Sequence, residues 1–198
     1  MIHPIEAESY RILEGRVDLS NLGPASRAVV ERVIHASADP EYATTMCVGD
    51  DAVEAGVRAV RAGAPVLCDV EMVRHGVHGI ETECHLPATG DDPDTTRAAL
   101  GMRAAAARHP AGAIVVVGCA PTALDEVVDV AEKGAFAPAL VIGLPVGFVG
   151  AAESKARLRA SGLPAISNAG EKGGSAVAAA AVNVLVRLAA DAPEGNES

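Results

Sequence analysis

Hydrophobic and polar positions along the chain follow two periodicities. Apolar residues three and four positions apart predict helices over residues 3–13, 26–39, 50–61, 95–108 and 176–190, with two more helices entered at residues 120–124 and 145–155. Short continuous apolar runs predict buried strands over residues 43–48, 65–69, 113–119, 138–144 and 164–167, and residues 79–86 fit an edge strand or a loop. This alternation predicts a three-layer α/β fold of about five mainly parallel strands, with helices on both faces.

The same pattern indicates how the chain is divided and where ligands bind. Residues 1–190 contain neither a linker nor an internal repeat and are expected to form one domain, followed by a polar tail, residues 191–198, that is expected to be disordered. Ligands of open α/β sheets bind at the carboxyl ends of the strands. We therefore expect the ligand-facing residues to be Asp69, residues 118–122 and residues 143–150.

Composition excludes several classes of function. Aromatic residues make up only 2% of the chain and its net charge is -10, which argues against a nucleic-acid partner and against an anionic membrane surface. No opening segment resembles a secretion signal, and no apolar run is long enough to cross a bilayer. The 4 cysteines are far apart and form no CxxC pair. They predict a reduced protein in the cytoplasm.

The helix over residues 26–39 carries the clearest candidate chemistry. Its core face is formed by Val29, Val30, Val33 and Ile34. Arg32 and His35 occupy an adjoining face together with Ala28, three and four residues apart. Pro40 disfavours helical geometry at the preceding residue, so the helix is expected to end at Asp39.

This placement sets His35 in the last helical turn. The negative end of the helix dipole and Asp39 favour the imidazolium form of His35, whereas Arg32 opposes it. A histidine near its titration point beside an arginine suits proton donation to an anionic ligand. The alternative interpretation is a solvated helix end with a hydrogen-bonded histidine.

Two further residues depart from what their helices favour. Ser9 lies on the apolar side of the first helix, where it is either a small packing residue or a ligand contact. Arg97 lies in the first turn of the helix over residues 95–108, which Asp94 or Thr95 could cap. A cation is unfavourable there, which suggests a nearby anion, although Arg97 could also be an ordinary exposed arginine.

The segment after the strand over residues 113–119 is a candidate anion site. A helix begins at once, so its backbone N–H groups would face an anion and Thr122 could add a hydroxyl group. Glycines 143, 147 and 150 allow a close approach to a ligand, but their spacing is not a dinucleotide fingerprint. Residues 170–175 (GEKGGS) lack the order of a phosphate-binding P-loop.

Three histidines raise the question of a metal. His75, His78 and His85 lie near one another in sequence, but Gly76 and Gly79 interrupt any helix that would aim the first two rings together. A closed zinc site needs four ligands. The sequence therefore predicts no metal site.

Several segments together resemble one enzyme family. Residues 31–39 (ERVIHASAD) are similar to the histidine segment of the precorrin-8X methylmutases, enzymes of cobalamin biosynthesis. Residues 3–10, 68–77, 94–99, 145–155 and 170–175 resemble other segments of that family. The chain departs from the family pattern at Cys119, where asparagine is usual, and at Glu171, where arginine is often found.

The resemblance implies a specific reaction. It implies an isomerase that moves a methyl group from C-11 to C-12 of precorrin-8X, or of its cobalt form, to give hydrogenobyrinate or cobyrinate. It also implies a homodimer without a nucleotide or redox cofactor. His35 would be the proton donor, and Ser9, Arg32, Arg97 and the backbone near Thr122 would bind the tetrapyrrole. The alternatives are a non-catalytic corrin carrier and, less favoured, a nucleotide-binding α/β enzyme.

Overall fold

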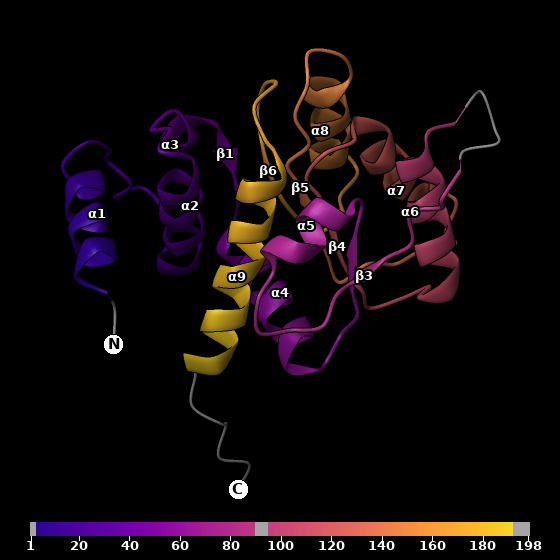
Figure 1. Ribbon diagram of the computed structural model, residues 1–198, viewed down its shortest axis with the longest axis horizontal. Helices are drawn as coiled ribbons and strands as arrows, with labels where there is room; N and C mark the ends of the chain where they lie inside the picture. The colour runs from indigo at the N-terminus through magenta and orange to yellow at the C-terminus, as the bar shows by residue number, and fades with distance from the viewer. Residues whose placement is uncertain (1–2, 90–94, 192–198) are drawn as a thin grey trace, which may run out of the picture.

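The computed structural model describes residues 3–89 and 95–191, and Figure 1 shows their arrangement. The helices in these residues are α1 Pro4–Glu14, α2 Pro24–Ser37, α3 Tyr42–Thr45, α4 Asp50–Arg61, α5 Glu71–Gly76, α6 Arg97–Arg108, α7 Pro121–Glu132, α8 Ala151–Ala160 and α9 Ser175–Asp191. The strands are β1 Met46–Cys47, β2 Val66–Cys68, β3 Glu83–Cys84, β4 Ile114–Val117, β5 Leu140–Gly143 and β6 Ala165–Asn168. Residues 90–94, part of the segment predicted to be a loop, and the predicted tail at residues 192–198 lie outside the described residues.

The strands of the described residues form one six-stranded sheet in the order β1-β6-β5-β4-β2-β3. Four neighbouring pairs are parallel, namely β6–β5, β5–β4, β4–β2 and β2–β3. The edge strand β1 is antiparallel to β6. The two strands at the edges, β1 and β3, have only two residues each. The predicted α/β class and the mainly parallel sheet are confirmed.

Helices cover both faces of the sheet. Alternate strand residues such as Val116 and Ile142 pack under α2, α4, α5 and α9, while Val115 and Val141 pack under α6, α7 and α8. α1 lies outside α2, at one end of the molecule, and α6 and α7 lie at the other end (Figure 1). The core consists mainly of valine, alanine, leucine and isoleucine. No described helix is long and apolar enough to cross a membrane.

Two short elements differ from the prediction. The strand expected at residues 43–48 is shortened to Met46–Cys47, because Thr44 and Thr45 donate their hydroxyl hydrogens to the Glu41 carbonyl within the short helix α3. The sequence pattern also gave no indication of α5. Each difference involves a helical segment of four to six residues. Segments this short leave no clear hydrophobic periodicity in the sequence.

The ends of α2 and α6 differ by one or two residues from the prediction. α2 ends at Ser37 rather than Asp39, because Ala38 adopts a left-handed conformation with φ 54°. α6 is capped by Thr96, whose hydroxyl accepts a hydrogen bond from the N–H of Ala99 at 3.2 Å. Thr95 is therefore not the cap, and Asp94 lies outside the described residues.

Candidate active site

The last turn of α2 and the middle of α1 form a cluster that we call the His35 corner, consisting of Ser9, Tyr10, Arg32 and His35. The imidazole Nδ1 of His35 lies 2.9 Å from the hydroxyl oxygen of Ser9. The ring of Tyr10 stacks on the imidazole, with centroids 5.0 Å apart and an angle of 10° between the planes. Stacking on one face and a hydrogen bond at one edge fix the orientation of the imidazole. Its Nε2 has no hydrogen-bond partner among the described residues.

A small hollow borders the His35 corner. It has a volume of about 110 Å³ and is lined by Ser9, Ile12, Leu13, Arg16, Val17, Ile34, His35, Ala38 and Pro40. Sites that enclose a drug-sized ligand usually measure about 300–1,000 Å³. In a single protomer, the hollow can therefore hold only part of a large ligand.

Arg32 lies one turn before His35 and is held by the neighbouring helix. Its guanidinium donates a hydrogen bond to Glu6 of α1 at 3.1 Å, and the two side chains are 30% and 35% exposed. The arginine thus faces the α1–α2 surface, as its helical spacing predicts. A ligand carboxylate at this position would share the guanidinium with Glu6.

Asp39, which the sequence places near His35, forms an ion pair with Lys172 in the structure. It lies beyond the end of α2 and accepts a hydrogen bond from Lys172 at 2.6 Å, while Glu41 accepts another from the same ammonium group at 2.7 Å. The contact with Lys172 lowers the pKa of Asp39, and the two carboxylates raise the pKa of Lys172. These ion pairs attach the loop after β6 to the end of α2.

A buried lysine binds the backbone of the loop after β6. Lys155 of α8 is inaccessible to solvent, and its ammonium group donates hydrogen bonds to the Lys172 carbonyl at 2.6 Å and to Asn168 Oδ1 at 3.0 Å. Burial lowers the pKa of Lys155 to about 8, and repulsion from Arg159 adds to the decrease. The sequence pattern indicates no role for Lys155. The only signal was its place at the end of residues 145–155, the segment that resembles the family most specifically.

The second predicted group, which we call the Arg97 edge, consists of Thr96, Arg97 and Thr122. It lies at the N-terminal ends of α6 and α7. Arg97 Nε donates a hydrogen bond to the Pro87 carbonyl at 2.7 Å, and the hydroxyl oxygens of Thr96 and Thr122 are 2.6 Å apart. All three residues are at least partly accessible, so this edge presents one cation and two hydroxyl groups to solvent.

Three backbone N–H groups just before α7, next to the predicted anion site, already bind a carboxylate of the protein itself. The buried carboxylate of Asp69 accepts hydrogen bonds from the N–H groups of Gly118, Cys119 and Ala120 at 3.1, 2.9 and 2.9 Å. Burial raises the pKa of Asp69, and the three N–H groups partly oppose this rise. The N–H groups of residues 118–120 are therefore not available to an external anion, and the role of the backbone near Thr122 stays a prediction. Asp69 instead fixes the loop that leads to Thr122.

The structure separates the residues that the sequence assigned to one site. Ser9, Arg32 and His35 lie on α1 and α2, whereas Arg97 and Thr122 lie on α6 and α7, at the opposite end of the longest molecular axis (Figure 1). A ligand bound at His35 is therefore far from Arg97 of the same chain.

Comparison with known proteins assigns the chain to a family. The family model described as precorrin-8X methylmutase matches residues 4–188. The chain belongs to the precorrin-8X methylmutase family. A relative from Methanothermobacter thermautotrophicus, named cobalt-precorrin-8 methylmutase, is 44% identical over 179 residues, which cover 88% of this chain and 86% of that protein. A relative from Pseudomonas aeruginosa, named precorrin-8X methylmutase, is 37% identical over 194 residues, covering 91% of this chain and 93% of that protein.

A solved structure agrees with this assignment. The crystal structure of the precorrin-8X methylmutase from Thermus thermophilus superposes with a TM-score of 0.85 and 40% sequence identity, covering 94% of this chain and 96% of that one. The methylmutase family match extends through both layers of helices, from α1 to α9. Nothing in these names supports the alternative of a non-catalytic carrier.

Proposed function

We propose that the protein moves a methyl group from C-11 to C-12 of precorrin-8X, or of its cobalt form, and that His35 supports this migration. Family membership over residues 4–188 makes the chain an isomerase of cobalamin biosynthesis. The observation that carries the role of His35 is its geometry: the ring is fixed by Ser9 and Tyr10, while Nε2 is left for a ligand.

The contacts of His35 suggest how it acts. When the Ser9 hydroxyl donates its hydrogen to Nδ1, the remaining ring proton is on Nε2. His35 then donates a hydrogen bond from Nε2 to the ring system of the substrate as the methyl group leaves C-11 and bonds to C-12. Full proton transfer would instead start from the imidazolium form, and the proton would return to His35 once the methyl group has moved. The product has the same atoms as the substrate, so the reaction needs no other reactant. A positioned proton donor contributes about 10²–10⁴ in rate.

Cations near the two groups would orient the substrate through its carboxylate side chains. The net charge of the chain is -10, so binding of a polycarboxylate requires local positive charge. Arg32 supplies it at the His35 corner and Arg97 at the Arg97 edge, with Thr122 beside Arg97. Orientation of this kind can contribute about 7–11 kcal/mol to lowering a barrier.

We also propose that the active form is a homodimer whose two protomers each complete a site. One protomer holds the His35 corner and the Arg97 edge at opposite ends, and the hollow beside His35 is only about 110 Å³. The loop after β5 exposes Val146, Phe148 and Val149, whose exposed fractions are 46%, 92% and 88%. Apolar groups this exposed are typical of a protein contact surface. A two-fold partner could cover them and bring its Arg97 edge to the His35 corner.

Two further parts of the proposal concern the extent of the domain and the location of the protein in the cell. We propose that residues 1–190 act as one domain, since α9 packs against α2, α4 and α5 along its length. We propose a cytoplasmic location, which the free thiols of Cys47, Cys68, Cys84 and Cys119 support.

The reaction is tested by a crossover experiment. Substrate labelled in the migrating methyl group is mixed with substrate labelled only in the ring, and the product masses are measured. We expect only the two parent masses, because an intramolecular shift keeps each methyl group on its own molecule. Partial burial of the thiol raises the pKa of Cys119, and Asp69 raises it further, which disfavours the thiolate that a methyl carrier would need. Products with both labels or neither would contradict the proposal and implicate Cys119.

The same assay identifies the natural substrate. The methyl shift changes the conjugation of the macrocycle, so turnover appears as a change in the visible spectrum. Metal-free precorrin-8X and its cobalt form are tested separately at equal concentration, and the form with the higher kcat/KM is the preferred substrate. If neither spectrum changes while both compounds bind, the protein would be a carrier rather than an isomerase.

A further inference from the structure

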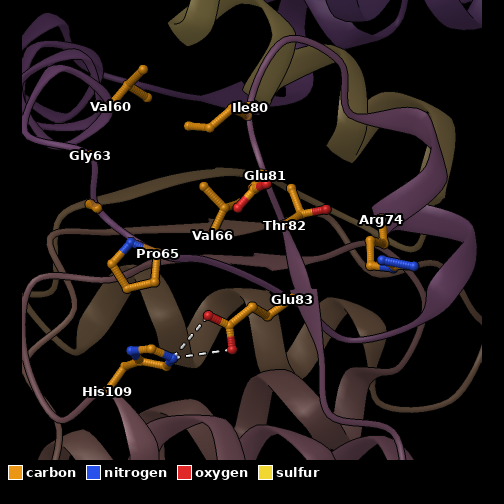
Figure 2. Close-up of a pocket in the computed structure, with 11 residues that line it drawn as sticks. Val60, Gly63, Pro65, Val66, Arg74, Ile80, Glu81, Thr82, Glu83 and His109 are labelled. Carbon is orange, nitrogen blue, oxygen red and sulfur yellow. Dashed lines mark hydrogen bonds and ion pairs between the residues drawn. The ribbon is translucent and has the colours of Figure 1, made fainter.

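A second polar cluster lies at the opposite end of the sheet from the His35 corner. Glu83 begins the edge strand β3 and His85 follows its last residue, and the two side chains meet on one side of the chain. α6 ends at Arg108, and the next residue, His109, faces this side just before the chain enters β4. Figure 2 shows the imidazole of His109 directed at the carboxylate of Glu83.

Both imidazoles converge on the same carboxylate. Nε2 of His85 lies 2.9 Å from Glu83 Oε2, and Nε2 of His109 lies 3.1 Å from Oε1 and 3.2 Å from Oε2. One ligand atom from each residue lies within 4.8 Å of the other two. Ligand atoms of a tetrahedral zinc site, bonded at about 2.0–2.2 Å, are separated by roughly 3.3–3.6 Å. Both imidazole–carboxylate distances therefore need only a small expansion for the three side chains to surround an ion.

The surroundings suit a partly desolvated cation. The side chains of His85, Glu83 and His109 are 21%, 39% and 23% exposed, so the cluster is partly shielded from solvent. Glu83 and His109 line a cavity of about 890 Å³, which leaves room for water in further coordination positions. Arg108 approaches Glu83 Oε2 at 3.9 Å, but its side chain is 69% exposed and can move into solvent.

We propose that Glu83, His85 and His109 form a binding site for a divalent transition-metal ion of the zinc type. Calcium and magnesium prefer oxygen ligands alone, whereas imidazole suits zinc and its neighbours in the first transition row. The ion would replace the hydrogen bonds at both Nε2 atoms, with the remaining ring proton on Nδ1. It would also join the two-residue strand β3 to the end of α6.

This proposal departs from the expectation that the chain has no metal site, and it involves different histidines from those that sequence proximity indicated. His75 Nδ1 contacts the Glu71 carbonyl, and neither His75 nor His78 belongs to the cluster that the structure forms among the described residues. The partner of His85 is His109, which a sequence pattern could not identify because the fold alone brings α6 back to β3. The site is independent of the methylmutase reaction.

Zinc binding to the full chain tests the proposal. The protein is expressed without a histidine tag, treated with a chelator, and titrated with Zn²⁺ by calorimetry. We expect saturable binding of one ion per chain, undiminished by excess Mg²⁺. His85→Ala and His109→Ala should each weaken binding by more than the roughly 10–100-fold that loss of an outer-shell partner costs. Glu83→Gln keeps the shape of the side chain but loses its charge, and should also weaken binding.

Two variants serve as matched controls. Glu81 lines the same cavity without belonging to the cluster, and His78 is an exposed histidine of the same segment (Figure 2 for Glu81). Glu81→Gln and His78→Ala should retain wild-type affinity. Circular dichroism establishes that each variant is folded, and the visible spectrum of bound Co²⁺ reports its ligands independently. Absence of saturable binding, or equal affinity in the wild type and the three ligand variants, would overturn the proposal.

Discussion

The His35 corner and the Arg97 edge differ in how they are built and in what supports them. At the corner, a stacked and hydrogen-bonded imidazole is fixed before any ligand arrives, whereas the edge offers an accessible arginine and two hydroxyl groups. A buried ionisable side chain fixes a loop near each group. Lys155 binds the loop that contacts the end of α2, and Asp69 binds the loop that leads to Thr122. The difference suggests that the corner performs chemistry and the edge binds carboxylates.

The largest effect is expected from removing the imidazole of the His35 corner. His35→Ala should lower turnover at saturating substrate by about 10²–10⁴, because a positioned proton donor is lost. Binding of the product should change little, since the arginines remain. Steady-state kinetics and a product titration measure both quantities. His78→Ala, which removes an exposed histidine away from the corner, is the control, and near-normal turnover of His35→Ala would exclude the proposed role.

The sequence predicts local features of this comparison well and the distances between them poorly. Continuous branched runs such as residues 114–117 identified the parallel strands, and helical spacing placed Arg32 and His35 on one face. Ser9 was singled out because a serine interrupts an apolar stripe, and the structure places it against His35. The role of each residue in catalysis or binding remains a prediction.

What the sequence did not reveal depends on contacts between distant segments. Asp69 accepts hydrogen bonds from N–H groups 49, 50 and 51 residues away, and the sequence just before α7 carries no sign that an internal carboxylate binds there. Likewise, nothing in the sequence near Arg97 indicates that α6 lies at the far end from α2. Periodicity reports which side of an element is buried, but not which other element covers it.

The separation of the two groups leads to a second prediction, on mixed dimers. Co-expression of His35→Ala with Arg97→Ala should restore activity, because one site of each mixed dimer then combines an intact His35 corner with an intact Arg97 edge. Random assortment predicts about a quarter of the wild-type activity, since half the dimers are mixed and each has one intact site. The rate is measured at a substrate concentration well below KM.

A matched pair of variants controls this experiment. His35→Ala and Arg32→Ala affect the same corner, so their mixed dimers contain no intact corner and should show no restoration. Light scattering measures the mass of the protein in both mixtures. If the two mixtures give equal activity although dimers are present, the His35 corner and the Arg97 edge do not serve one shared site.

The third prediction concerns the arginines of the two groups. Arg32→Ala and Arg97→Ala should each weaken corrin binding by about 1.5–3 kcal/mol, the usual contribution of a hydrogen bond to a charged group, and each should reduce the dependence of binding on salt. Arg58, a highly exposed arginine of α4, supplies the control variant Arg58→Ala. Dissociation constants measured at two salt concentrations provide the check. Values unchanged from wild type in both variants would remove these arginines from the site.

The smallest effect is expected for Lys155, the buried lysine that binds the loop at the end of α2, and it concerns the free energy of unfolding. Burial lowers the pKa of Lys155 to about 8 in the folded protein, whereas an unfolded chain has the ordinary value of about 10.4. Between these two values the unfolded chain binds more protons at this lysine than the folded chain does. The free energy of unfolding therefore rises with pH across this window, and below about pH 8 the contribution of Lys155 is constant and at its least favourable.

Comparison with a variant isolates this contribution from other groups that titrate in alkali. The free energy of unfolding from urea titrations is measured for the wild type and for Lys155→Met between pH 7.5 and 9.5. The difference, wild type minus variant, should increase by about 1–2 kcal/mol over this range, because one pKa unit corresponds to about 1.4 kcal/mol. Lys133→Met, at an exposed lysine, should show no such increase. A constant difference for Lys155→Met would mean that this lysine keeps an ordinary pKa, and that the loop at the His35 corner is held by a fully charged ammonium group throughout.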